Sequence, residues 1–182
     1  DDNMLNALCK KIVPGWDSPH DPRTRERGGN AASIVGVFVN LVLFAGKFIA
    51  GVLSASIALQ ADAFNNLSDA GSSVISLLSF KLASRPADEE HPFGHARYEY
   101  LASMVVAVLI LLLGYELIQS SIEKIISPGP IAFSWLSVGV LVASIGLKLF
   151  LYLFYKRVGR HIGSPVLEAA SADSISDVLA TS

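Results

Sequence analysis

Hydrophobic residues form long runs along this chain, and most of the charged residues fall between the runs. A helix needs about 20 mostly apolar residues to cross the hydrocarbon core of a membrane. Four runs reach that length, and a fifth begins near Pro165 but stops at Ser182; the five cover residues 31–53, 57–83, 98–123, 132–156 and 165–182. The pattern therefore predicts an all-α membrane protein, built as a polytopic helical bundle.

Lysine and arginine residues predict how this bundle lies in the membrane. They cluster in the N-terminal tail (residues 1–30), between the second and third predicted helices, and between the fourth and fifth. The predicted helices place all three clusters on one side of the membrane. Because cytoplasmic loops carry an excess of basic residues, we expect the N-terminus to be cytoplasmic. We expect the plasma membrane as the location of this multi-pass protein.

The second predicted helix has polar residues spaced along one of its faces. Positions i, i+3, i+4, i+7 and i+11 lie on the same side of a helix, and the residues at these positions are Asp62, Asn65, Asn66, Asp69 and Ser73. A carboxylate at the centre of a bilayer costs about 3 kcal/mol or more. We therefore expect these residues to face a cavity, a protein partner or an ion rather than lipid.

The fifth predicted helix carries a second polar pair, because Asp173 and Asp177 are four residues apart and share a face. If the two polar faces meet, they supply three carboxylates and one amide oxygen. Such oxygen ligands suit Mg²⁺, Ca²⁺ and Mn²⁺, whereas imidazole and thiolate suit zinc and copper. The sequence thus indicates a divalent-cation site, with Asp62 at the start of its helix or at a cavity mouth; the candidate ligands are Asn65, Asp69, Asp173 and Asp177.

Two other interpretations of these aspartates remain open. The aspartates can hold helices together in a non-transporting scaffold, where Lys47 and Lys148 are available as ion-pair partners on the first and fourth predicted helices. They can also form the active site of an intramembrane protease, which needs two carboxylates that share a proton. The third carboxylate and Asn65 fit a cation site better, so we expect a protein that is not an enzyme.

Composition narrows the classes of function further. Only 16% of the residues are charged, against about 25% in soluble domains. No stripe of basic residues interleaved with aromatic residues indicates a nucleic-acid partner. Cys9 is the single cysteine, which excludes an internal disulfide bond and a multi-cysteine metal site. We expect a divalent metal ion to bind this chain, and no resident cofactor.

The segment SIALQADAFNNLSDAGSSVISLLSFKLASRPADEEHPFGHARYEYLA resembles the second helix, the following loop and the start of the third helix in the cation diffusion facilitator family. The motif Asp173-x-x-x-Asp177-Val-Leu resembles the fifth helix of the same family, and the likeness covers about residues 31–182. The resemblance implies a six-helix transporter, usually a homodimer, which exports divalent metal in exchange for protons. Members normally carry a cytoplasmic C-terminal domain. We expect that domain and the sixth helix to be absent here, and the fifth helix to be truncated.

The resemblance also implies which residues bind the metal, namely Asn65 and Asp69 on helix two and Asp173 and Asp177 on helix five. Zinc-transporting members usually have a histidine where this chain has Asp173, and its loss is a feature of manganese-type members. We therefore expect Mn²⁺/proton antiport by alternating access, in which metal and protons compete for the same carboxylates. The alternative is a Zn²⁺ or Fe²⁺ exporter of the same family.

The loop between the second and third predicted helices resembles a second, cytoplasmic-side metal site of some members. The matching residues are Asp88, His91 and His95, which suit zinc by ligand type. The alternative is that the sequence HPFGH is a structural turn. In that case Pro92 and Gly94 shape the loop, and the histidines bond to the backbone.

Overall fold

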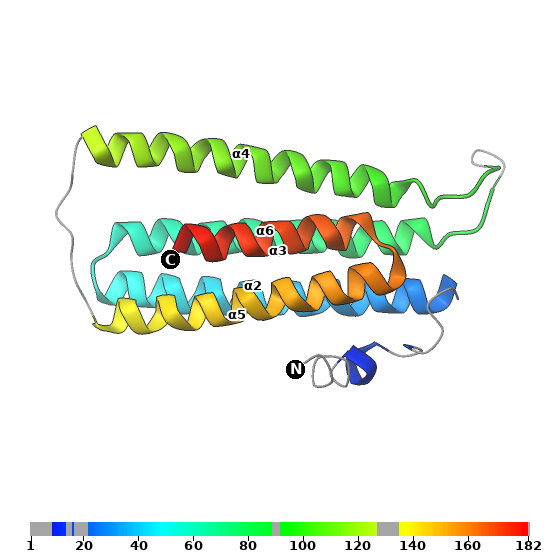
Figure 1. The fold of residues 1–182 in the computed structure, drawn as a ribbon, viewed down its shortest axis with the longest axis horizontal. Coiled ribbons are helices and arrows are strands. Elements are labelled where there is room, and N and C mark those ends of the chain that lie inside the picture. Colours follow the sequence, from blue (N-terminus) through cyan, green and yellow to red (C-terminus); the bar gives the residue numbers. More distant parts are fainter. Residues whose placement is uncertain (1–8, 14–15, 17–21, 89–91, 127–134, 182) are drawn as a thin grey trace.

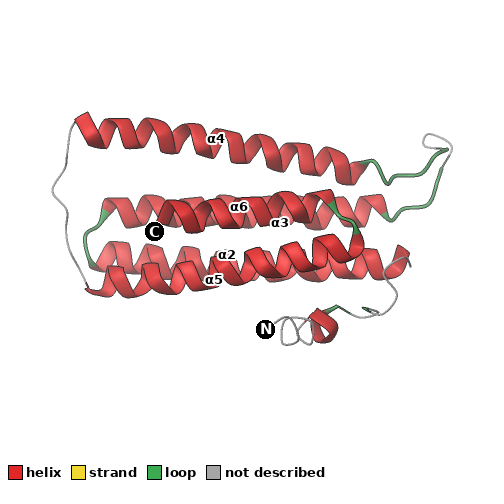
Figure 2. Ribbon diagram, in the orientation of Figure 1, coloured by secondary structure: helices red, strands yellow, loops and turns green. Residues whose placement is uncertain are grey.

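The computed structural model describes residues 9–13, 16, 22–88, 92–126 and 135–181. Long helices make up most of this part of the chain, and it contains no strand (Figure 2). The all-α prediction is therefore confirmed. The long helices are α2 (Pro22–Leu53), α3 (Ile57–Ala83), α4 (Tyr98–Ile126), α5 (Trp135–Ile162) and α6 (Pro165–Thr181).

Successive helices run in opposite directions along one long axis (Figure 1). Helix α2 packs along α3 and α5, while α6 packs along α5 and α4 and also contacts α3. Helix α6 therefore contacts three other helices. The hydrophobic core includes buried apolar side chains of α5, among them Leu151, Phe154, Tyr155 and Val158.

Two tight turns set up this arrangement. Between α2 and α3, Ala55 has a φ of 51° and the Ser56 hydroxyl accepts a hydrogen bond from the Leu59 amide at 3.3 Å, which caps α3. Between α5 and α6, Gly163 has a φ of 62°, a conformation that favours glycine. Pro165 is the first residue of α6, a position where a missing amide hydrogen costs nothing. The second turn folds α6 back along α5.

The predicted and observed helix bounds agree best for α3, which covers residues 57–83 in both. Helix α2 begins at Pro22 instead of residue 31, and α5 continues to Ile162 instead of residue 156. These extensions are too polar to have been counted as membrane spans. Residues 22–30 and 157–162 are nevertheless helical and continuous with α2 and α5. The predicted residues 132–134 and 182 lie outside the described residues.

By length and composition, three described helical segments can cross a membrane: Arg23–Leu53, Tyr98–Glu116 and Trp135–Ile162. At 27 residues α3 is long enough, but its polar stripe lowers its mean hydropathy. Helix α3 turns Leu67, Val74 and Leu78 outward, as expected for the face opposite the stripe. Its polar face is directed into the bundle, where α6 also lies.

Candidate metal centre

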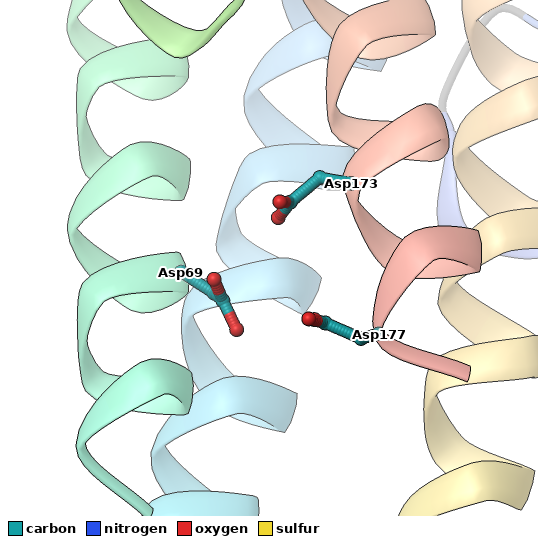
Figure 3. A group of neighbouring side chains, drawn as sticks. All are labelled: Asp69, Asp173 and Asp177. Atoms are coloured by element: carbon teal, nitrogen blue, oxygen red, sulfur yellow. The ribbon is translucent and has the colours of Figure 1, made fainter. Parts of the chain in front are cut away.

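Three aspartates converge between α3 and α6. One carboxylate oxygen from each of Asp69, Asp173 and Asp177 lies within 4.8 Å of the others. Figure 3 shows Asp69 projecting from α3 and the other two from α6, all toward the same space. Asp69 is buried and the other two are partly buried. The structure thus brings together the polar faces of helices that are about 100 residues apart in the sequence.

The α5–α6 turn is what brings the α6 carboxylates to this place. Helix α6 starts at the same end of the bundle as the C-terminus of α5, and it runs back toward the middle (Figure 1). Asp173 and Asp177 are one helical turn apart, so both face α3. Buried Ser171 and Ser174 allow close packing on neighbouring helices, and the Ser171 hydroxyl donates to the Tyr152 carbonyl of α5 at 3.3 Å.

Helix α3 supports Asp69 through its neighbour Ser73. The Ser73 hydroxyl donates a hydrogen bond to the backbone carbonyl oxygen of Asp69 at 2.9 Å. It also lies 3.3 Å from the Tyr155 hydroxyl of α5. Asn65 lies one turn before Asp69 on the same face and is partly buried. The ligand role of Asn65 stays a prediction.

The other polar residues of the α3 stripe have partners of their own. Asp62 forms an ion pair with Lys47 of α2, with 2.8 Å between the Asp62 Oδ2 and Lys47 Nζ atoms. The side-chain amide of Asn66 donates a hydrogen bond to the backbone carbonyl oxygen of Asp62 at 3.0 Å. Asp62 is thus held near the start of α3, two turns from Asp69, by a buried lysine.

A lysine from α5 joins the three aspartates. The Lys148 Nζ atom lies 2.6 Å from Asp69 Oδ2, and it also donates to Asp177 Oδ2. The Lys148 side chain is only 3% exposed. The sequence offers Lys148 as an ion-pair partner of the aspartates, and the structure shows that contact. The signal that it belongs to the site is a charged residue inside the apolar run of α5.

Sequence reasoning missed Tyr155, which is seven residues after Lys148 and so lies on the same face of α5. Its side chain is 2% exposed, and its hydroxyl contacts Ser73, next to Asp69. The spacing of Lys148 and Tyr155 is the signal that could have identified this face. Tyr155 therefore belongs to the polar layer that supports the three carboxylates.

The loop after α3 brings together two of its three candidate ligands. His95 Nε2 lies 3.5 Å from Asp88 Oδ2, and His95 Nδ1 lies 3.1 Å from the Pro86 carbonyl oxygen. Gly94 has a φ of 79°, as expected for a residue that shapes a turn. His91 lies outside the described residues. For His95, the bond to the backbone is the feature expected of the structural-turn interpretation.

Comparison with known proteins relates this chain to proteins of metal efflux. Residues 33–182 match the cation efflux transmembrane domain. The manganese efflux system protein MneS of Bacillus subtilis is 36% identical over 154 residues, which cover 82% of this chain and 51% of that protein. Metal tolerance protein 2 of Oryza sativa is 32% identical over 188 residues, which cover 85% of this chain and 48% of that protein.

An uncharacterized transporter of Methanocaldococcus jannaschii is also 36% identical, over 149 residues that cover 82% of this chain and 52% of that protein. The chain spans about half the length of the curated relatives it matches. The matched half contains α3 and α6, and hence all three converging aspartates.

Proposed function

Because this chain belongs to the cation diffusion facilitator family, we propose that it exports divalent metal ions from the cytoplasm, with Mn²⁺ as its main substrate. The observation that carries the proposal is the convergence of Asp69, Asp173 and Asp177 from two helices on one site. In the proposed mechanism these three carboxylates bind the metal. Asn65 adds its amide oxygen from the adjacent turn of α3.

The choice of Mn²⁺ rests on the chemistry of the ligands. The candidate ligands that come together are all carboxylates. Among the described residues, no histidine or cysteine joins them. Hard oxygen ligands suit Mn²⁺, whereas an imidazole or thiolate favours Zn²⁺. The similarity to a manganese efflux protein supports the same choice. Zn²⁺ or Fe²⁺ export through the same site is the alternative.

Exchange of metal for protons follows from the crowding of the three carboxylates. When the metal leaves, Lys148 offsets only part of the negative charge of the three carboxylates, and binding of protons relieves the remaining repulsion. Metal and protons would then compete for the same oxygen atoms during alternating access. Under this proposal the antiport needs no separate proton pathway at the site.

The arrangement of basic residues supports a cytoplasmic N-terminus. The proposed transporter is a homodimer in the plasma membrane. The N-terminal ends of α2, α4 and α6 lie at the same end of the bundle as the C-terminal ends of α3 and α5 (Figure 1). Basic residues gather at this end, as the positive-inside rule requires of a cytoplasmic face. They include Arg25, Lys81, Arg85, Arg97, Arg157 and Arg160.

Transport into proteoliposomes tests the proposal. We expect Mn²⁺ uptake by the unsubstituted chain, faster when the vesicle lumen is acidic because protons leave as metal enters. Asp173→Ala and Asp177→Ala should abolish uptake while the helical content is retained. Glu168→Gln is the matched control, since Glu168 is an exposed acid on the same helix. Uptake at unsubstituted rates by both alanine variants would refute the proposed site.

The same preparation separates the proposal from its two rivals. A helical scaffold would bind no Mn²⁺ in isothermal titration calorimetry. An intramembrane protease would cleave added transmembrane peptides, and that cleavage would be lost in Asp69→Asn. Metal uptake without peptide cleavage is the result we expect.

A further inference from the structure

Lys148 reaches the three aspartates from α5, a helix that supplies none of the predicted metal ligands. Its ammonium group contacts Asp69 of α3 and Asp177 of α6, so it bridges the two helices that form the site. A buried ammonium at membrane depth is tolerated only with such partners. The position of Lys148 is therefore specified by the same carboxylates that are proposed to bind the metal.

The formal charges show what the ammonium does to the site. Three aspartates carry three negative charges, and Lys148 reduces the net charge of the cluster to minus two. One divalent cation neutralises that charge. Without Lys148 the three carboxylates would attract a divalent cation more strongly, because Coulomb attraction grows with net charge and is weakly screened in a buried site.

We propose that Lys148 is a tethered competitor of the transported metal, which occupies Asp69 and Asp177 between transport events and limits the affinity for the ion. The inference rests on the proposed metal site. Lysine is suited to this role because its charge sits at the end of a flexible four-carbon stem. The ammonium can leave the carboxylates as metal arrives without a movement of α5. Limited affinity matters because an ion bound too tightly is not released.

The substitution Lys148→Met tests this role. Methionine keeps a similar length and removes the charge. We expect Lys148→Met to bind Mn²⁺ at least about tenfold more tightly in isothermal titration calorimetry. In proteoliposomes both KM and the maximal rate should fall, because the ion enters readily but leaves slowly. A purely structural role of Lys148 would lower the rate without tightening the binding.

Lys47→Met provides the matched control. Lys47 is also a buried lysine with an aspartate partner, but it pairs with Asp62 rather than with the cluster. Its removal should leave the dissociation constant for Mn²⁺ within about twofold of the unsubstituted value. Lys148→Arg provides the opposite test. A guanidinium group binds two carboxylates more firmly than an ammonium does, so we expect weaker Mn²⁺ binding in this variant.

Each outcome supports or overturns the inference. Unchanged or weaker Mn²⁺ binding in Lys148→Met would overturn it and leave the proposed function intact, provided that the unsubstituted chain binds and transports the metal. Absence of Mn²⁺ binding in the unsubstituted chain would overturn both. If Lys148→Met does not fold, Lys148→Gln keeps a hydrogen-bond donor without the charge. For that variant the Mn²⁺-dependent rise in Tm replaces calorimetry and should exceed that of the unsubstituted chain.

Discussion

The hydroxyl group of Tyr155 lies directly against the backbone of Gly36. A β-carbon at Gly36 would fall 1.6 Å from the Tyr155 hydroxyl oxygen and 2.8 Å from the Ser73 hydroxyl oxygen. Helices α2, α3 and α5 therefore meet at this point, one turn of α3 away from Asp69. The close approach depends on the absence of a side chain at residue 36.

Gly36→Ala should therefore separate these helices. Overpacking of a buried contact costs about 1–3 kcal/mol, and we expect a lower Tm in detergent together with weaker Mn²⁺ binding. Gly46→Ala is the control, because nothing lies within 4 Å of a β-carbon at Gly46 on the same helix. Alanine favours a helix over glycine, so this variant should be at least as stable as the unsubstituted chain.

In the Gly36→Ala variant, removal of the Tyr155 hydroxyl should relieve part of the steric strain between the new β-carbon and residue 155. In Gly36→Ala/Tyr155→Phe the nearest ring carbon would still lie 2.8 Å from the new β-carbon, so only partial recovery of Tm is expected. Equal Tm values for Gly36→Ala and Gly46→Ala would show that the contact between α2 and α5 is not tight.

Asp62 should matter for stability but not for metal binding. Asp62→Asn would leave Lys47, whose side chain is 3% exposed, without its anionic partner. Loss of one member of a buried pair costs about 3–5 kcal/mol, and we expect about 1–3 kcal/mol here because the Asp62 side chain is 32% exposed. Thermal unfolding measures the loss.

The double variant Lys47→Met/Asp62→Asn should recover much of that stability, because the unpaired charge is gone. In both variants the dissociation constant for Mn²⁺, measured by calorimetry, should stay within about twofold of the unsubstituted value. A tenfold loss of affinity in Asp62→Asn would instead make Asp62 a ligand.

Arg25 should not be replaceable by lysine. Its Nη2 atom lies 2.6 Å from Glu99 Oε2 of α4, and its Nε atom donates to the Ile162 carbonyl at the end of α5, at 3.1 Å. An ammonium group lacks the fixed fork of donors that makes both contacts. Glu99 is fully buried, so Arg25→Lys should lower stability by about 1–2 kcal/mol.

Thermal unfolding of Arg25→Lys against Arg27→Lys checks this expectation. Arg27 is exposed on the same helix, and its substitution should leave Tm unchanged. If the two variants unfold at the same temperature, the contacts of Arg25 with α4 and α5 do not stabilise the bundle.

Asp173→His should change the preferred metal. The substitution places an imidazole among the carboxylates, and imidazole favours Zn²⁺ over Mn²⁺. We expect the ratio of Zn²⁺ to Mn²⁺ uptake in proteoliposomes to rise by about tenfold or more. Asp173→Asn is the control, since it removes the charge without adding a soft ligand. A ratio that is the same in both variants would contradict the explanation of selectivity by ligand hardness.

The sequence predicted α3 and its polar face closely, because the apolar run 57–83 is bounded and the polar spacing is regular over Asp62, Asn65 and Asp69. The start of α2 at Pro22 was not predicted. Its first turns contact other helices through Arg25, and such tertiary contacts leave no signal in hydropathy. The pattern of apolar runs therefore locates the spans better than it locates the helix ends.

The convergence of the three aspartates was predictable from the sequence, but the position of Lys148 was not. Carboxylates spaced by four residues on two apolar helices indicate a shared site wherever the helices meet. Lys148 was visible as a charge within an apolar run, but its partner depends on the rotation of α5 about its axis. That rotation is set by the packing of Tyr155 and Phe154 against other helices, which the sequence pattern does not encode.

The turn at Gly163 assigns the residues of the cluster to two helical hairpins. It joins α5 and α6 into one helical hairpin, as the turn at Ala55 joins α2 and α3 into another. Lys148 and Asp177 belong to the first hairpin, whereas Asp69 belongs to the second. A shift of one hairpin against the other would keep the lysine beside Asp177 and change its distance from Asp69. The ion pair between Lys148 and Asp69 thus links the α5–α6 hairpin to the α2–α3 hairpin.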